Sequence, residues 1–122
     1  MIRTSYYRNV SPSDDNLVSI SRSEPPGFQD IESYPALAPS KFLLNDYKAG
    51  RITDAQYTVL YEGDVLAMLP VDKVAKDLEG KTLLCWEARG FCHRHLVAKW
   101  LVHAGYECEE LPKRDGKNRK LF

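Results

Sequence analysis

The segment Lys81–Ala104, KTLLCWEARGFCHRHLVAKWLVHA, has the pattern of a strand, a loop and a helix around which the rest of this chain is arranged. Its first part, Lys81–Trp86, is nearly all apolar after the lysine, which is typical of a central strand covered on both faces. Its last part, Cys92–Ala104, carries apolar side chains at helical spacing, and Gly105 is suited to end that helix. A short polar loop joins the two elements, and we expect the chemically versatile side chains of the protein to lie there.

Three more strands and three more helices are predicted on either side of this segment. The strands are expected at Ile2–Tyr7, Leu17–Ser21 and Tyr106–Leu111, and the helices at Lys41–Ala49, Thr53–Leu69 and Val71–Leu78. Ser40 is a candidate N-cap, and Thr53 with Gln56 matches a capping box. Strands separated by helices indicate the α/β class, here a small single-domain sheet of about four, mostly parallel strands flanked by helices.

The second predicted strand is followed by a proline-rich loop, Ser23–Ser40. Its prolines suppress regular structure, and the apolar side chains between them indicate that the loop packs onto the protein. Loops of this length are uncommon in small domains. Two interpretations are open: the loop is a wall or lid over a site, or it is a structural wrap.

The overall charge argues against nucleic-acid binding by bulk attraction. The 122 residues include 17 Lys+Arg and 17 Asp+Glu, so the formal net charge is zero. We assign residues 1–111 to the single domain. Residues 112–122 form a basic C-terminal tail or a final short strand, and the tail either touches phosphates or is simply solvated.

The cysteine content predicts free thiols in a reducing compartment. There are three cysteines, an odd number, so no small disulfide framework follows. Nothing at the N-terminus resembles a signal peptide, and no apolar run is long enough to cross a membrane. We therefore expect a cytoplasmic protein without a membrane partner.

Polar side chains at two strand ends predict an anion site. A strand that runs through a loop into a helix N-terminus directs unpaired backbone N–H groups toward the loop. Arg94 lies in the first turn of that helix, where a cation is explained by an anionic ligand or by pairing with Glu87. Ser19, Ser21 and Arg22 end another strand and could contribute to the same crevice, because ligands of α/β sheets bind at carboxyl ends of strands.

Three residues of this corner are candidates for catalysis. Glu87 follows the strand directly and is placed for general-base or nucleophilic work, or it forms a salt bridge with Arg89 or Arg94. Cys92 at the helix start is either a thiolate nucleophile or a small buried residue. His93 either transfers protons near neutral pH or holds the loop by hydrogen bonds.

A metal site is not expected from the sequence. Cys85, Cys92, His93 and His95 are potential ligands, but the two histidines are two residues apart on a helix and point in different directions. No Cys-x-x-Cys pair is present.

The same residues carry a resemblance to a known family. The segments MIRTSYY (1–7), LVSISR (17–22), LAPSKFLLNDYKAGRIT (37–53), LLCWE (83–87) and FCHRHLVAKWL (91–101) resemble short bacterial, archaeal and phage members of domain of unknown function family 488. The most specific part is the Cys-His-Arg signature, and the resemblance covers roughly residues 1–111. It implies a compact α/β domain and no particular reaction. The positions that map onto the family pattern are Arg22, Glu87, Cys92, His93 and Arg94.

Two functions from different classes follow from these observations. The first is an enzyme or binder for a phosphate-bearing ligand, a nucleotide or nucleic-acid component; as an enzyme it would be a transferase or hydrolase, for example a glycosyl transferase with Glu87 as nucleophile. The second is a non-catalytic protein-interaction module, phage- or host-encoded, in which the Cys-His-Arg motif is a structural node. The sequence indicates neither a cofactor nor an oligomeric state.

Overall fold

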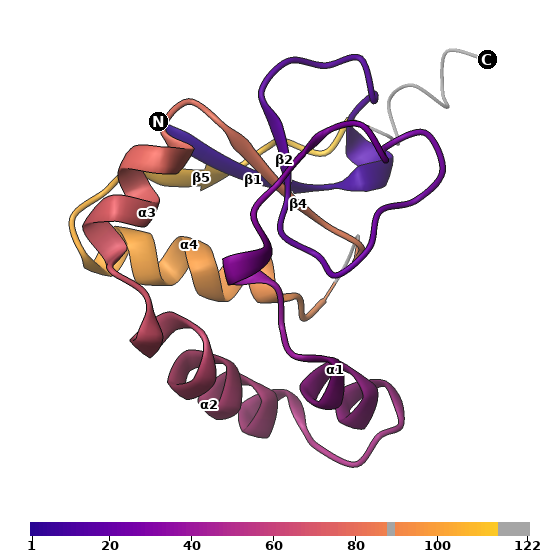
Figure 1. Ribbon diagram of the computed structural model, residues 1–122, viewed down its shortest axis with the longest axis vertical. Helices are drawn as coiled ribbons and strands as arrows, with labels where there is room; N and C mark the ends of the chain where they lie inside the picture. Colours follow the sequence, from indigo (N-terminus) through magenta and orange to yellow (C-terminus); the bar gives the residue numbers. More distant parts are fainter. Residues whose placement is uncertain (88–89, 115–122) are drawn as a thin grey trace.

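The computed structural model describes residues 1–87 and 90–114, and within them five parallel strands form one sheet in the order β3-β2-β4-β1-β5 (Figure 1). The strands are β1 (Ile2–Tyr6), β2 (Leu17–Ser19), β3 (Glu32–Ser33), β4 (Thr82–Cys85) and β5 (Cys108–Glu110). The α-helices are α1 (Lys41–Lys48), α2 (Asp54–Asp64), α3 (Val71–Leu78) and α4 (His93–His103), and the short 3-10 helices are η1 (Tyr7–Asn9), η2 (Pro35–Leu37) and η3 (Leu66–Met68).

The predicted α/β class is confirmed, with one strand more than expected. The additional strand, β3, lies inside the proline-rich loop and pairs with Val18 and Ser19 of β2. Its two residues, Glu32 and Ser33, are both polar and exposed, so the hydrophobic pattern of the sequence does not predict this strand. The predicted Thr53–Leu69 helix stops at Asp64 and continues as η3, which turns the side chain of Leu66 into the core.

The central strand β4 supplies side chains to two separate cores. Successive residues of a strand point to opposite faces of the sheet. Leu83 accordingly joins the large core on the α4 side, and Leu84 joins a smaller cluster on the other side. Both are fully buried, as predicted for a strand covered on both faces.

Helix α4 covers one face and packs against β1, β4 and β5 (Figure 1). Val97 and Leu101 form its fully buried stripe. The helix begins after Cys92 and ends at His103, and Gly105, which follows the C-cap Ala104, has a φ of 98° in the left-handed region. The N–H of Tyr106 donates to the carbonyl of Leu101 at 3.0 Å, so the end of the helix is closed by a Schellman motif that turns the chain toward β5.

A loop rather than a helix covers the second face. Tyr7, Leu17, Phe28 and Leu84 form the buried cluster there, with the Tyr7 and Phe28 rings 5.0 Å apart edge to face. Phe28 belongs to the proline-rich loop, so that part of the loop is a structural wrap. Ser23 and Pro39, near the two ends of the loop, line the cavity described below. The loop is therefore a structural wrap in its middle and part of a cavity wall near its ends.

The topology opens a crevice at the carboxyl ends of β2 and β4. These strands are neighbours, but β2 leads outward to β3 while β4 leads through α4 to β5 on the opposite side of the sheet. Connections that diverge in this way leave the usual ligand-binding crevice of parallel sheets.

Two predictions concern other parts of the chain. No helix within the described ranges is long and apolar enough to cross a membrane. Residues 115–122, which carry most of the predicted basic tail or final strand, lie outside the described residues. Arg114, the last described residue, donates from its guanidinium to the Asn9 carbonyl oxygen at 3.1 Å.

Candidate functional site

A cavity of about 390 Å³ lies in the crevice between the ends of β2 and β4. It is lined by residues that follow the two strands, by the start of α4, by α1 and by the end of the proline-rich loop: Ser21, Arg22, Ser23, Pro39, Leu44, Lys48, Cys85, Trp86, Glu87, Cys92 and His93. Five of the residues predicted for a site are in this list: Ser21, Arg22, Glu87, Cys92 and His93. Ser19 and Arg94 do not line the cavity.

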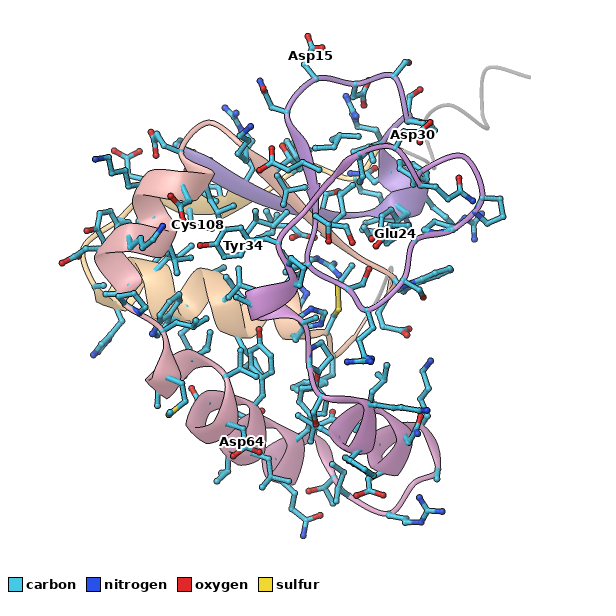
Figure 2. All side chains as sticks on the ribbon, viewed as in Figure 1. Asp15, Glu24, Asp30, Tyr34, Asp64 and Cys108 are labelled. Carbon is cyan, nitrogen blue, oxygen red and sulfur yellow. A yellow bond between two sulfur atoms is a disulfide. The ribbon has the colours of Figure 1, made fainter. Side chains whose placement is uncertain are left out.

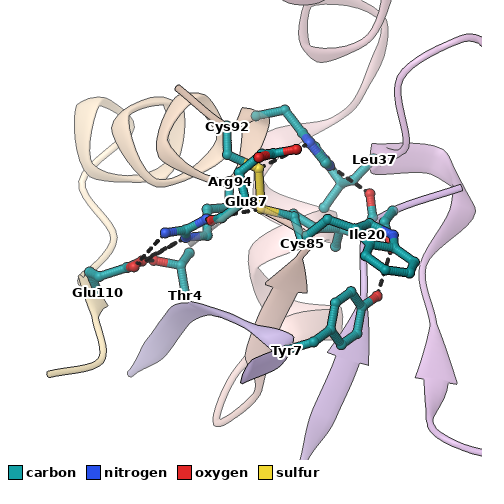
Figure 3. Close-up of a disulfide and its surroundings, with 12 residues drawn as sticks. Thr4, Tyr7, Ile20, Leu37, Cys85, Glu87, Cys92, Arg94 and Glu110 are labelled. Atoms are coloured by element: carbon teal, nitrogen blue, oxygen red, sulfur yellow. Dashed lines mark hydrogen bonds and ion pairs between the residues drawn. A yellow bond between two sulfur atoms is a disulfide. The ribbon is translucent and has the colours of Figure 1, made fainter. Parts of the chain in front are cut away.

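Two of the cysteines form a disulfide within this cavity. Cys85 ends β4, Cys92 caps α4, and their sulfur atoms are bonded (Figure 3). Both residues are buried. The prediction of three free thiols is therefore wrong for this pair, because spacing in the sequence did not show that the loop folds back and brings the strand end to the helix start. Cys108 is the free cysteine.

His93 holds the start of α4 to the end of β2. Its Nε2 lies 2.7 Å from the carbonyl oxygen of Ile20, so Nε2 must carry the hydrogen and donate it. Its Nδ1 lies 3.8 Å from the sulfur of Cys92. Burial, with a smaller contribution from the nearby Arg94 charge, lowers the pKa of His93 to about 4, so the ring is neutral at physiological pH.

Arg94 is buried and does not line the cavity, and its guanidinium belongs to a part-buried network (Figure 3). Its Nε and Nη2 both donate to the carboxylate of Glu110, at 3.0 and 2.8 Å. Its Nη1 donates to the Glu87 carbonyl oxygen at 2.6 Å and to the Cys85 sulfur at 3.1 Å. The guanidinium carbon also lies 5.4 Å from the centre of the Tyr6 ring. Arg94 thus ties β1, β4 and β5 to α4.

The predicted serines lie in a second buried network. The Tyr7 hydroxyl donates to Ser19 Oγ at 2.9 Å, and Ser19 Oγ donates to the Glu24 carboxylate at 2.8 Å. Ser21 Oγ donates to the Ser23 carbonyl oxygen at 2.6 Å. Burial raises the pKa of Tyr7, so its hydroxyl stays protonated. These hydroxyls shape the floor of the strand end, and only Ser21 reaches the cavity.

Two cations line the cavity, one from the end of β2 and one from the end of α1. Arg22 follows β2 and reaches the Pro39 carbonyl oxygen at 3.4 Å, and Lys48 ends α1. Both side chains are exposed. None of the ion pairs between described residues involves either of them. Their charges therefore remain available to a ligand.

Glu87 is the carboxylate of this cavity. It is exposed, and no described residue forms an ion pair with its side chain. The predicted alternative, a salt bridge to Arg94, is wrong, since Arg94 pairs with Glu110 and contacts only the backbone of Glu87. The other predicted partner, Arg89, lies outside the described residues.

An aromatic cavity adjoins the first and shares Leu44, Lys48, Glu87, Cys92 and His93 with it. Its other lining residues are Tyr47, Tyr57 and Phe91. The three rings pack on each other with centroids 5.0 to 5.5 Å apart. The two cavities together form a cleft, one end polar and cationic, the other aromatic.

Sequence reasoning missed Lys48 and the three aromatic residues of this cleft. Tyr47 and Lys48 lie on α1, and Tyr57 lies on α2, which packs beside α1 (Figure 1). Nothing in the pattern of either helix places it next to the start of α4. The available signal was Phe91, an apolar residue in an otherwise polar loop, which indicates a contact partner for that loop.

No protein family matches this chain, and no curated protein or solved structure is significantly similar to it. The resemblance to the unknown-function family therefore stays a prediction, and the function has to be argued from the cleft itself.

Proposed function

We propose that this protein binds a phosphate-bearing small molecule, a nucleotide or nucleic-acid component, in the cleft between β2, β4, α1 and the start of α4. The observation that supports this most strongly is the pair of exposed cations, Arg22 and Lys48, at a cavity that carries one carboxylate, Glu87. The cavity lies at the divergent carboxyl ends of parallel strands, where α/β proteins usually bind such ligands.

The aromatic end of the cleft supports a nucleotide over a bare phosphate. Tyr47 and Phe91 are partly exposed and offer ring surface on which a base could stack, and the buried Tyr57 supports them from behind. The phosphate would then lie toward Arg22 and Lys48, and the start of α4 would add backbone N–H groups. In this proposal Arg94 acts indirectly, by fixing the loop that carries Glu87.

If the protein is an enzyme, Glu87 is the residue that we assign to catalysis. It lines both ends of the cleft, and its carboxylate can act as a general base or as the nucleophile of a transferase or hydrolase. His93 is an unsuitable acid at neutral pH, because its ring is neutral and its Nε2–H is engaged by Ile20. Cys92 can act as a nucleophile only after the disulfide is reduced.

A ligand panel tests the proposal. Thermal stability is measured against nucleotides, nucleosides, inorganic phosphate and sulfate, because a ligand of the native state raises stability with its concentration. We expect a nucleotide to raise the melting temperature and Lys48→Ala to weaken that shift. The matched control is Lys41→Ala, an exposed lysine at the other end of α1 that does not line the cleft.

Two outcomes would contradict the proposal. One is a flat panel with well-folded protein, and the other is an equal shift in wild type, Lys48→Ala and Lys41→Ala. Glu87→Gln then separates binding from chemistry: we expect it to retain the nucleotide-dependent shift and to lose turnover of any substrate that the wild type converts.

We further propose a cytoplasmic location. The cytoplasm keeps most thiols reduced. There Cys85 and Cys92 would exist largely as a dithiol, which matters for the inference below.

The second candidate function is a non-catalytic interaction module, phage- or host-encoded. It is favoured by Arg94, which is buried and fully engaged by Glu110 and Glu87. An exposed apolar surface formed by Ile52, Ala55, Val59 and Leu60 would also suit a protein partner. A flat ligand panel followed by recovery of one stoichiometric partner whose binding Val59→Asp abolishes would favour this function.

A further inference from the structure

We propose that Cys85, Cys92 and His93 form a binding site for a thiophilic divalent metal ion, best represented by Zn²⁺, once the disulfide is reduced. The proposal does not depend on the identity of the ligand in the cleft. The three potential donor atoms, two sulfurs and one nitrogen of the imidazole ring, all lie within 4.8 Å of one another. All three residues are buried.

The spacing of the donor atoms suits tetrahedral zinc. Zn–S and Zn–N bonds of about 2.3 and 2.0 Å place neighbouring S and N ligands about 3.6 Å apart and two sulfurs about 3.8 Å apart. Cys92 Sγ and His93 Nδ1 are already 3.8 Å apart. Reduction would let the two sulfurs separate to the distance that two ligands of one ion need.

The backbone spacing agrees with such a site. The Cα atoms of Cys85 and Cys92 lie 7.2 Å apart. Disulfides usually join Cα atoms about 4.4–6.8 Å apart. A metal ion between the two sulfurs joins more widely spaced positions without drawing the strand end and the helix start together.

His93 is oriented as a metal-binding histidine. Its Nε2–H donates to the Ile20 carbonyl oxygen, so the neutral ring presents the unprotonated Nδ1 toward the Cys92 sulfur. Metal-binding histidines typically donate their other ring N–H to a backbone carbonyl or a carboxylate in this way. The sequence argument against a metal concerned His93 paired with His95, which is exposed and belongs to a different side of the helix.

Arg94 supports the second ligand. Its Nη1 donates to Cys85 Sγ at 3.1 Å, and the guanidinium stabilises the thiolate form that binds metals. Each of two ligands thus has its own outer hydrogen bond, one from Arg94 and one to Ile20. Such partners hold ligands in place and tune the bound ion.

The ion would retain one position for a ligand from the cleft. Three protein ligands and one open position are the arrangement of catalytic rather than structural zinc. Because Cys85, Cys92 and His93 all line the first cavity, the fourth ligand would be water or an oxygen of the bound molecule.

Metal binding requires that the disulfide first be reduced, for which a dithiol is a suitable reductant. The reductant supplies two electrons and two protons, the Cys85–Cys92 bond breaks, and the reductant itself becomes a disulfide. Zn²⁺ then displaces the two thiol protons, giving a neutral centre of two thiolates, one imidazole and the dication.

Cobalt(II) is the probe for the first experiment, because its absorption reports tetrahedral thiolate ligation. Full-length protein is reduced anaerobically with a phosphine, freed of metal, and titrated with Co²⁺ and then Zn²⁺. We expect one Co²⁺ per chain, a thiolate-to-cobalt charge-transfer band, and complete displacement by Zn²⁺. Oxidised protein should bind neither ion, a comparison that requires no substitution.

Cysteine variants supply the matched test. Cys92→Ser and His93→Gln should each weaken Zn²⁺ binding by at least about 100-fold. Cys108→Ser should leave it unchanged, since Cys108 pairs with Ile2 at the start of β1 while Cys85 pairs with Tyr6 at its end. Figure 2 shows Cys108 well away from the disulfide.

The thiol count gives an independent readout. Bound Zn²⁺ should protect Cys85 and Cys92 from a thiol reagent and leave the Cys108 thiol unprotected. An octahedral cobalt spectrum, equal binding by reduced and oxidised protein, or equal binding by Cys92→Ser would overturn the proposal and mark the metal as adventitious. None of these outcomes bears on the nucleotide panel, so the two proposals fail separately.

Discussion

Arg22 and Arg94 were predicted to do the same work, and they occupy opposite environments. Arg22 follows β2, is exposed, and has no ion-pair partner among the described residues. Arg94 lies in the first turn of α4, is 2% exposed, and donates to Glu110, Glu87 and Cys85. Only the first has charge available to a ligand, and only the second contributes strongly to the fold.

The difference between them comes from a residue far away in the sequence. Glu110 lies on β5 beside β1 and accepts from Thr4 Oγ1 at 2.5 Å as well as from Arg94. Without that carboxylate, the guanidinium would lie uncompensated at the positive end of the α4 dipole, and an external anion would be needed to balance its charge. Whether an arginine at this corner keeps its charge for a ligand or uses it within the fold thus depends on whether a carboxylate faces it. The following variants test this distinction in order of expected effect.

Arg94→Ala should have the largest effect on stability. It removes a buried cation that joins β4, β5 and α4, and we expect the free energy of unfolding to fall by about 4 kcal/mol. Urea denaturation at neutral pH measures this. A loss below 1 kcal/mol would show that the buried network is dispensable and would remove the contrast with Arg22.

Acidification should produce the next largest effect on stability, through the buried His93, which contacts the end of β2 and precedes Arg94. Its folded-state pKa of about 4 lies below the ordinary value of 6.5. The unfolded chain therefore takes up a proton as pH falls through 6.5, whereas the folded protein resists until about 4. The contribution of His93 to the free energy of unfolding is therefore fully present above pH 6.5 and is lost as the pH falls toward 4. We expect this loss to be about 3 kcal/mol.

The control for the acid effect is a comparison of two histidines. Denaturation of oxidised, metal-free protein is followed from pH 7 to 4 in His93→Gln and in His103→Gln, where His103 is exposed. The first variant should show a shallower loss of stability with falling pH than the second. Identical slopes would mean that His93 titrates normally.

Glu110→Ala should lower the free energy of unfolding by about 2 kcal/mol. The variant leaves the buried Arg94 without its counter-charge. The loss is moderate because Arg94 still donates to the Glu87 carbonyl oxygen and because water can enter the space left by the Glu110 side chain. The matched control is Glu109→Ala, which is exposed on the same strand as Glu110 but forms no ion pair with a described residue, and we expect it within about 0.5 kcal/mol of wild type. Equal effects of the two variants would contradict the assigned pairing.

Arg22→Ala should have the smallest effect on stability, within about 0.5 kcal/mol. Its effect should appear instead in ligand affinity, with about a tenfold loss for the nucleotide that shifts the wild type. Calorimetric titration measures this. If Arg22→Ala destabilises the empty protein as much as Arg94→Ala does, the two arginines do not differ in role.

The sequence predicted the elements of this corner well, because their causes are local. Ser40 accepts from the Leu43 N–H at 3.1 Å, and Thr53 and Gln56 form the expected capping box. The helix predicted at Cys92–Ala104 is observed at His93–His103, and the strand predicted at Lys81–Trp86 is observed at Thr82–Cys85. Apolar periodicity and capping residues were sufficient for these elements.

What the sequence left open depends on contacts between distant segments. The Arg94–Glu110 pair requires β5 to lie beside β1, and Lys48 reaches the cleft only because α1 packs near the start of α4. The Cys85–Cys92 disulfide is close in sequence, but its formation depends on how the intervening loop turns. Local patterns carry no information on such approaches.

The parallel pairing of β1 with β4 has a consequence for how the cleft comes into being. Arg3 pairs with Thr82, about eighty residues later, and most of the helices intervene. Pairing over such separations requires the entropy cost of closing a long loop before the stabilising contacts form, and this slows folding. A chain emerging from the ribosome has its β2 end, with Arg22, long before β4 and α4 arrive. The cleft is therefore a late product of folding, because it forms only once β4 and the start of α4 have joined β2.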